Sequence, residues 1–171
     1  MERIAMDFEQ EFKVLYRPLC LFALQYIPRT EDAEDIVQQA FTDVWEKLCE
    51  GASILNMKAY MYQAVKNRSL LLLTREKEEL LERNIPDEAD DSDEEQIRIA
   101  ERDARLWTAI DKLPPERRKI FLLSKRDGLK YQEIADELHI SVKTVENQIS
   151  KALKSLRDTA CLLYTSDAAD E

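Results

Sequence analysis

The chain has 171 residues, a net charge of -10 and 44% hydrophobic residues, which is enough to build one ordinary domain or two small ones. With 2 glycines and a predominance of good helix formers, the composition indicates an all-α protein. No apolar run approaches the roughly 20 residues of a membrane-spanning helix, and no basic segment precedes an apolar stretch at the N-terminus, so we expect neither membrane insertion nor a secretory signal.

Cysteine and histidine usage argues against a metal or catalytic centre. The 3 cysteines, Cys20, Cys49 and Cys161, lack the spacing of metal ligands, and His139 is the single histidine. We expect reduced thiols in a cytoplasmic protein without metal or cofactor. The sequence also lacks a phosphate-binding glycine loop and a nucleophile–base pair. It therefore predicts a protein that is not an enzyme, has no catalytic residues and takes no small-molecule substrate.

Three helices are expected in a first domain over residues 7–82. The first has apolar residues at helical spacing, at Phe8, Phe12, Leu15, Leu19, Phe22 and Tyr26. Pro28 ends this helix, and Thr30 is expected to cap the N-terminus of a second helix that Gly51 ends. After a short loop over residues 52–56, a third helix is expected from Lys58 to about Glu82. Phe41 and Trp45 of the second helix are interpreted as core residues.

An acidic segment follows this first domain. Residues 82–103 contain 3 basic and 10 acidic residues, a net charge of -7. Residues 84–95 have almost no apolar side chain and include Pro86, so they cannot bury enough surface to offset the entropy cost of ordering. We predict a flexible acidic linker over residues 83–97.

Helices return in a second domain over residues 98–160. Residues 104–160 contain 12 basic and 8 acidic residues, a net charge of +4. One helix is expected from about Gln96 to Leu113, where Pro114 disfavours the helical conformation of the residue before it. Pro115 fits the first turn of the next helix, which runs to Lys125, and Gly128 then breaks the chain.

Residues 131–156 have the pattern of a helix-turn-helix. Ala135 is small enough for the two helices to approach closely, and apolar residues at the expected spacings supply a shared core, namely Ile134, Leu138, Ile140, Val145 and Ile149. Ser141 is the expected N-cap of the second helix. His139 occupies the turn, where it tolerates a left-handed conformation better than most residues; a phosphate contact by His139 is the alternative interpretation.

The second helix of such a motif enters the DNA major groove by its N-terminal half. The candidates for contact with base edges are Lys143, Thr144, Asn147 and Gln148. Asparagine can pair with adenine and lysine with guanine. Ser141 and Lys151 are assigned to phosphates.

A second nucleic-acid element is predicted in the first domain. Residues 51–75 contain no acidic residue, and basic side chains alternate there with Tyr60 and Tyr62. Basic groups follow phosphates and aromatic faces stack on unpaired bases. A position at the edge of the core is the alternative for both tyrosines.

Both halves of the chain resemble one family. The segments LPPERRKIF (residues 113–121), GLKYQEIA (128–135) and LKSLR (153–157) are similar to region four of extracytoplasmic-function (ECF) sigma factors of the sigma-70 family. The segments DAEDIVQQAFTDVW (32–45) and KAYMYQAVKNR (58–68) resemble region two of the same family. The resemblance is greatest to the Bacteroidetes-type group. The run Leu70 to Leu73 departs from the family pattern, which usually has Asp or Asn followed by an aromatic residue.

The resemblance implies a transcription initiation factor with two DNA-binding domains. Region two would bind the clamp helices of core RNA polymerase through Asp35, Gln38 and Gln39. It would open and read the minus-ten promoter element through the set Ser53, Asn56, Lys58, Tyr60, Tyr62, Lys66, Asn67 and Arg68. Region four would bind the polymerase flap and read the minus-thirty-five element through Ser141, Lys143, Thr144, Asn147, Gln148 and Lys151. The resemblance also implies an anti-sigma partner and an acidic linker in the polymerase channel.

The last eleven residues, 161–171, do not continue the helical pattern. They resemble one reading frame of a transposon-based sequencing adapter, and a disordered acidic tail is the alternative.

Two other functions remain open for the whole chain. A response-regulator effector would share residues 134–156 but would need a receiver or ligand-binding first domain. A helical adaptor would bind protein alone and would tolerate alanine at Lys143 and Asn147.

Overall fold

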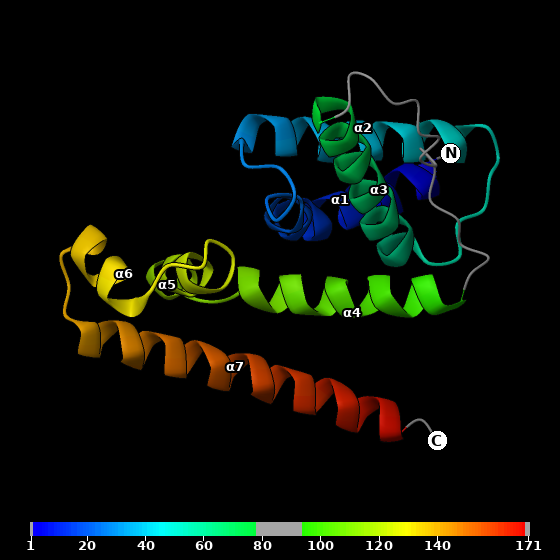
Figure 1. Cartoon of the computed structure of the whole chain (residues 1–171). Coiled ribbons are helices and arrows are strands. Elements are labelled where there is room, and N and C mark those ends of the chain that lie inside the picture. Colours follow the sequence, from blue (N-terminus) through cyan, green and yellow to red (C-terminus); the bar gives the residue numbers. More distant parts are fainter. Residues whose placement is uncertain (1, 78–93, 170–171) are drawn as a thin grey trace. The chain divides into compact units, whose positions relative to one another are not determined.

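The computed structural model describes residues 2–77 and 94–169, and this part of the chain is built from seven helices (Figure 1). They are α1 (Glu2–Ala23), α2 (Thr30–Cys49), α3 (Met57–Lys77), α4 (Glu94–Asp111), α5 (Pro115–Lys125), α6 (Tyr131–Leu138) and α7 (Val142–Ala169). The all-α expectation is confirmed. The chain divides into two compact units, one ending at Thr108 and the other beginning at Ala109.

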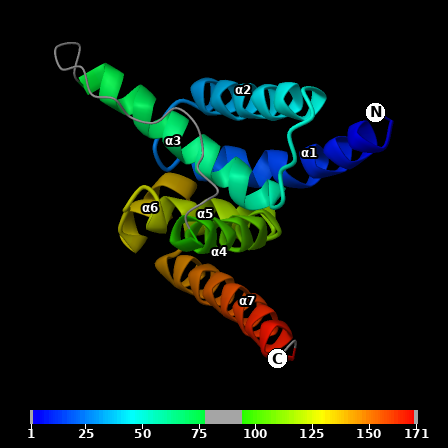
Figure 2. The ribbon, with the colours of Figure 1, turned by 90° about the vertical axis from the view of Figure 1, so that its right-hand side faces the viewer.

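In the first unit, α1, α2 and α3 pack against one another, and α3 crosses the other two (Figure 2). Their contact surfaces include the predicted apolar positions Leu15, Leu19 and Phe22 of α1 together with Val37 of α2, each at most 1% exposed. Apolar burial of this kind stabilises a leucine or phenylalanine position by about 1.5–3 kcal/mol. Tyr26 is an exception, because α1 ends at Ala23 and Tyr26 lies in the turn that follows.

The expected cap at Thr30 is wrong. Thr30 is the first residue of α2, Arg29 occupies the N-cap, and no side chain caps this helix. The negative charges of Glu31 and Asp32 in the first turn stabilise the helix instead, because they lie at the positive end of the helix dipole. At the other end, Gly51 follows the helix with φ +95°, a conformation that glycine adopts at little cost.

The helices α3 and α4 begin slightly earlier than predicted. Asn56 caps α3, since its Oδ1 accepts a hydrogen bond from the Ala59 amide at 3.1 Å. Helix α4 begins at Glu94, so residues 94–97 are helical and not linker. Residues 78–93, which include the rest of the predicted linker, lie outside the described residues. Residues 94–108 belong to the first unit, although the sequence places the start of the second domain at residue 98.

The second unit begins at the end of α4 and contains α5, α6 and α7. Pro115 starts α5 as predicted. Gly128, with φ +71°, interrupts the helical backbone between α5 and α6. Helix α7 continues to Ala169, so the expectation that the helical pattern stops near residue 160 is wrong. Residues 161–169 contain neither glycine nor proline, and this composition permits the helix to continue.

Two features are absent from residues 2–77 and 94–169. No helix there has the length and apolar character to cross a membrane. No group of three or more histidine, cysteine or acidic side chains there could hold a metal ion.

Candidate nucleic-acid interface

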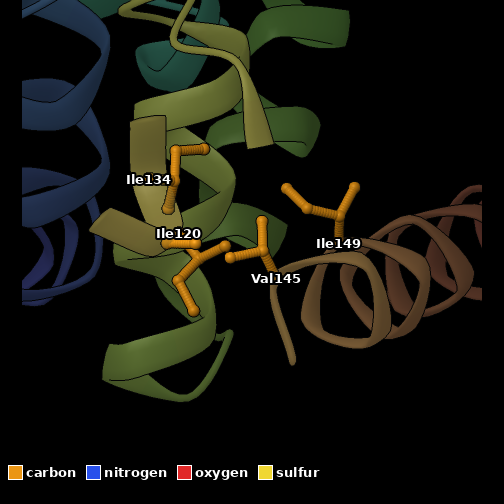
Figure 3. Close-up of a cluster of buried hydrophobic side chains, with 5 residues drawn as sticks. Ile120, Ile134, Val145 and Ile149 are labelled. Atoms are coloured by element: carbon orange, nitrogen blue, oxygen red, sulfur yellow. The ribbon is translucent and has the colours of Figure 1, made fainter. Parts of the chain in front are cut away.

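The helix-turn-helix of the second unit is held by one apolar cluster. Ile120 of α5, Ile134 and Ala135 of α6, and Val145 and Ile149 of α7 are each less than 5% exposed and meet between the three helices (Figure 3). The predicted residues Leu138 and Ile140 are only partly buried and pack against this cluster. A core shared by three helices fixes the orientation of α7, which is the requirement for a helix that must present its outer face to DNA.

The turn between α6 and α7 is built as the sequence predicts. His139 has φ 57° and ψ 44°, the left-handed conformation, and its backbone N–H donates to the Ala135 carbonyl. Ser141 caps α7, because its Oγ accepts a hydrogen bond from the Thr144 amide at 3.0 Å. The Ser141 and Thr144 hydroxyl oxygens also lie 2.8 Å apart. This cap satisfies one of the free backbone amides at the start of the helix.

The exposed face of α7 carries Lys143, Asn147 and Lys151, which we call the recognition stripe. Because these residues are spaced by four positions, they lie along one side of the helix. Two other predicted contacts are already engaged within the protein. The Thr144 hydroxyl is paired with Ser141, and Gln148 is half-buried and accepts a hydrogen bond from Arg117 Nε at 3.1 Å. The sequence alone did not indicate the contact with Arg117, which is 31 residues away.

The basic and aromatic element of the first unit is more buried than predicted. Tyr62 is 1% exposed and packs 4.9 Å from Phe22, between ring centroids. Its face therefore cannot stack on a base, and Tyr62 lies inside the core, deeper than the core-edge position given as the alternative. Tyr60 is half-buried, and its hydroxyl oxygen accepts a hydrogen bond from Lys47 Nζ at 2.7 Å. The Lys47 ammonium also lies 5.4 Å from the Tyr60 ring centroid, within the range of a cation–π contact.

The remaining predicted residues of this element differ in exposure, and two of them are held by acidic partners. Ser53 and Lys58 are exposed, whereas Lys66, Asn67 and Arg68 are half-buried. Asn56 is tethered twice, since besides capping α3 it donates from Nδ2 to Glu101 Oε1 of α4 at 2.5 Å. Arg68 is tethered by an ion pair with Asp43 of α2. Two candidate DNA contacts therefore have acidic partners within the protein.

The candidate protein-binding face lies on α2. Asp35, Gln38 and Gln39 are exposed there, as predicted. Gln38 Nε2 donates to the Tyr16 hydroxyl at 3.1 Å, and Gln39 Nε2 donates to Asp43 Oδ1 at 3.0 Å. These bonds hold both amides at the surface in defined orientations.

Beside these glutamines, α1 and α2 form a groove of about 540 Å³. Its lining is mainly aromatic and consists of Ala5, Phe8, Phe12, Gln38, Phe41, Thr42 and Trp45. Phe41 is 3% exposed, as expected of a core residue. Trp45 is only half-buried, so the expectation that it is a core residue is wrong. The four-residue spacing of Phe8 and Phe12 predicted burial and did not reveal that their faces line an open groove.

Most of the second unit is similar to a known family. Residues 103–156 match the family model "Sigma-70, region 4". The chain is 30% identical over 133 residues to the ECF RNA polymerase sigma factor SigE of Mycolicibacterium smegmatis, a match that covers 74% of this chain and 51% of that protein. The chain thus spans about half the length of this relative.

Other matches extend over most of both partners. The RNA polymerase sigma-E factor of Streptomyces avermitilis is 27% identical over 90% of this chain and 84% of its own length. The sigma factor SigV of Bacillus subtilis is 26% identical over 88% of this chain and 85% of its own length. A solved structure of RpoE in complex with the anti-sigma factor NepR, from Bartonella quintana, covers 90% of this chain at 19% identity with a TM-score of 0.35.

The alternative of a response-regulator effector with a receiver domain does not agree with the fold. A phosphate receiver is a doubly wound sheet with helices on both faces. Residues 2–77 contain helices and no strand.

Proposed function

We propose that this chain, a member of the ECF group of the sigma-70 family, is a transcription initiation factor that binds core RNA polymerase and directs it to specific promoters. One observation carries the proposal. The recognition stripe is exposed on the second helix of a helix-turn-helix whose residues match sigma-70 region 4. The chain carries no catalytic machinery in this account, because the polymerase supplies the chemistry.

The second unit would read the minus-thirty-five element as duplex DNA. Asn147 is suited to adenine and Lys143 to guanine, and each bidentate contact discriminates by about 1–3 kcal/mol. Lys151 and the start of α7 at Ser141 would contact phosphates, since helix N-termini attract anions. Thr144 and Gln148 would contribute only after giving up their internal hydrogen bonds. The flap of the polymerase would bind this unit.

The first unit would open and hold the minus-ten element. Ser53 and Lys58 are the exposed contacts, and Tyr60 offers a half-buried ring. Lys66, Asn67 and Arg68 follow on the same helix and would contact the backbone of the displaced strand. Phosphate contacts of this kind release counterions, so binding should weaken as salt rises.

Core polymerase would bind the face of α2 that carries Asp35, Gln38 and Gln39. The aromatic groove next to Gln38 provides apolar surface for a helix of the polymerase clamp. Exposed aromatic surface surrounded by polar groups is typical of a protein interface. An apolar groove that receives an amphipathic helix is a recurrent mode of recognition.

Several finer features belong to the same proposal. The chain is assigned to the Bacteroidetes-type group, works in the cytoplasm where polymerase acts, and is controlled by an anti-sigma partner. Its two DNA-binding domains are joined by the acidic segment, which would lie in the polymerase channel. These assignments rest on the resemblance of residues 32–68 and 113–157 to the family.

Binding to purified core polymerase tests the proposal at its first step. In size-exclusion chromatography the chain should co-elute with core enzyme, and Asp35→Ala should weaken that association. Glu50→Ala is the matched control, because Glu50 is an exposed acidic residue at the far end of α2, outside the proposed clamp-binding face and outside the unit assigned to the flap. Failure of the wild-type chain to associate with core would contradict the proposal.

A further inference from the structure

A second row of polar side chains lies beside the recognition stripe on α7. Thr144 and Gln148 are spaced by four positions, so they share one side of the helix, next to the stripe. Both side chains are engaged within the protein. The Thr144 and Ser141 hydroxyl oxygens lie 2.8 Å apart, and Gln148 Oε1 accepts a hydrogen bond from Arg117 Nε at 3.1 Å. This row is therefore held by the protein, whereas the stripe is exposed.

Apolar packing brings Arg117 to Gln148. Ile120 lies one helical turn after Arg117 on α5, and Ile149 follows Gln148 on α7. Ile120 and Ile149 are 4% and 2% exposed and belong to the cluster between the three helices (Figure 3). The core that orients α7 also keeps the Arg117 guanidinium next to the Gln148 amide.

The bond with Arg117 occupies the atom that Gln148 needs to read adenine. A glutamine pairs with adenine through two hydrogen bonds, in which its oxygen accepts from N6 and its nitrogen donates to N7. Arg117 Nε already donates to that oxygen, and a charged donor makes a stronger hydrogen bond than a neutral one. An amide turned toward α5 in this way cannot present both of its polar atoms to a base.

We propose that Arg117 is a positioning residue that determines promoter specificity by holding Gln148 away from the DNA. Base reading by α7 is then restricted to the recognition stripe, and the base pair opposite Gln148 is left unread. This inference rests on the proposed function, because it assumes that α7 reads the minus-thirty-five element in the major groove.

Selection of DNA by the complete complex tests this role. The probe is a pool of duplex promoter fragments, taken from a start site that the chain directs, with the minus-thirty-five segment randomised. The readout is the base frequency at each position of the fragments bound by core polymerase with the full-length chain. Arg117→Met removes the donor. Lys119→Met is the matched control, because Lys119 is an exposed cation of α5 that lies two positions away and faces another side of the helix.

The expected result for Arg117→Met is an adenine preference of about tenfold at one base pair that the wild-type chain leaves unread, the discrimination of one bidentate pair. Lys119→Met should weaken binding equally for all sequences, as loss of a cation near phosphates does. Adding Gln148→Ala to Arg117→Met should abolish the new preference. Base frequencies that are the same for Arg117→Met and the wild-type chain would overturn the inference, because a purely structural or phosphate-binding role changes affinity without changing specificity.

A second variant keeps the test decisive if thermal melting shows that Arg117→Met is unfolded. Gln148→Ala alone should leave the base frequencies of the wild-type chain unchanged, because the held side chain reads no base. Loss of a wild-type preference in Gln148→Ala would overturn the inference.

The same selection separates this inference from the function on which it rests. A wild-type preference that disappears with Asn147→Ala supports DNA reading by α7, and an unchanged profile for Arg117→Met then shows that the positioning role alone is wrong. If the wild-type complex selects no sequence in the randomised segment, the proposed reading of the minus-thirty-five element is wrong, and the positioning role fails with it.

Discussion

Asp43 of α2 and Arg68 of α3 form an ion pair, and the other oxygen of the same carboxylate accepts a hydrogen bond from Gln39. The side chains of Arg68 and Asp43 are 23% and 31% exposed, so the pair is largely removed from water. One carboxylate therefore joins a residue assigned to polymerase binding with a residue assigned to DNA binding.

Removal of this carboxylate should destabilise the first unit. Asp43→Ala leaves the half-buried Arg68 guanidinium without its ion-pair partner, and we expect the free energy of unfolding to fall by about 1–2 kcal/mol. Urea unfolding followed by circular dichroism measures the change. Glu46→Ala, at an exposed position of the same helix, is the control. Equal midpoints for the two variants would show that the ion pair does not contribute.

The left-handed turn at His139 leads to opposite expectations for two substitutions. Valine at this position should destabilise the protein by about 1–2 kcal/mol, because a β-branched side chain is strained at positive φ. Glycine should leave the melting temperature unchanged or raise it, since it adopts this conformation without strain. Thermal melting of His139→Val and His139→Gly separates the two. If both variants have the same melting temperature, the turn does not require φ 57° in solution.

The recognition stripe should matter more than its half-buried neighbour. Asn147→Ala is expected to lower affinity of the polymerase complex for its promoter about tenfold, which corresponds to one lost base contact. Gln148→Ala should have a smaller effect, because that side chain is already bonded to Arg117. Filter binding of promoter fragments to the complex measures both. A larger loss for Gln148→Ala would move the DNA-reading face to the other side of α7. The helical adaptor would be favoured if Lys143→Ala and Asn147→Ala both retained full function.

The two cysteines whose surroundings the structure describes should differ in reactivity. Burial raises the pKa of Cys20 from 9.0 to about 11, so its thiol stays protonated at neutral pH. Cys49 is exposed. Iodoacetamide at neutral pH should therefore label Cys49 first, and peptide mass spectrometry locates the label. Faster labelling of Cys20 would contradict its burial.

The raised pKa of Cys20 also predicts how the stability of the folded chain changes with pH. The folded chain holds this proton more tightly than the unfolded chain, so the stabilisation is complete below pH 9.0 and is lost as pH rises through about 11. Cys20→Ser should flatten the alkaline arm of the stability profile. An unchanged alkaline arm would contradict this assignment.

Local signals explain the accurate part of the prediction from sequence. Ser141 as a cap, His139 in a left-handed turn and Ala135 at a close approach depend on neighbours within a few residues. The residue types themselves carry this information, so the geometry of the helix-turn-helix follows from the sequence.

Long-range packing explains what the sequence did not predict. Tyr62 has an aromatic side chain of the kind that stacks on bases, but the crossing of α3 over α1 buries it against Phe22. Glu101 was part of an acidic run, and only the fold brings it to Asn56, 45 residues away. Periodicity specifies which face of a helix is apolar, and it does not specify which other helix covers that face.

Promoter-specific transcription tests the central claim most directly. Purified chain and bacterial core polymerase are incubated with genomic promoter fragments, and the 5′ ends of the transcripts are mapped. The account predicts discrete start sites that require the chain, weaken with Asp35→Ala and Asn147→Ala, and share sequence at the minus-ten and minus-thirty-five positions. Transcripts from core that are unchanged by the chain, together with tight and specific binding of duplex promoter by the chain alone, would contradict it.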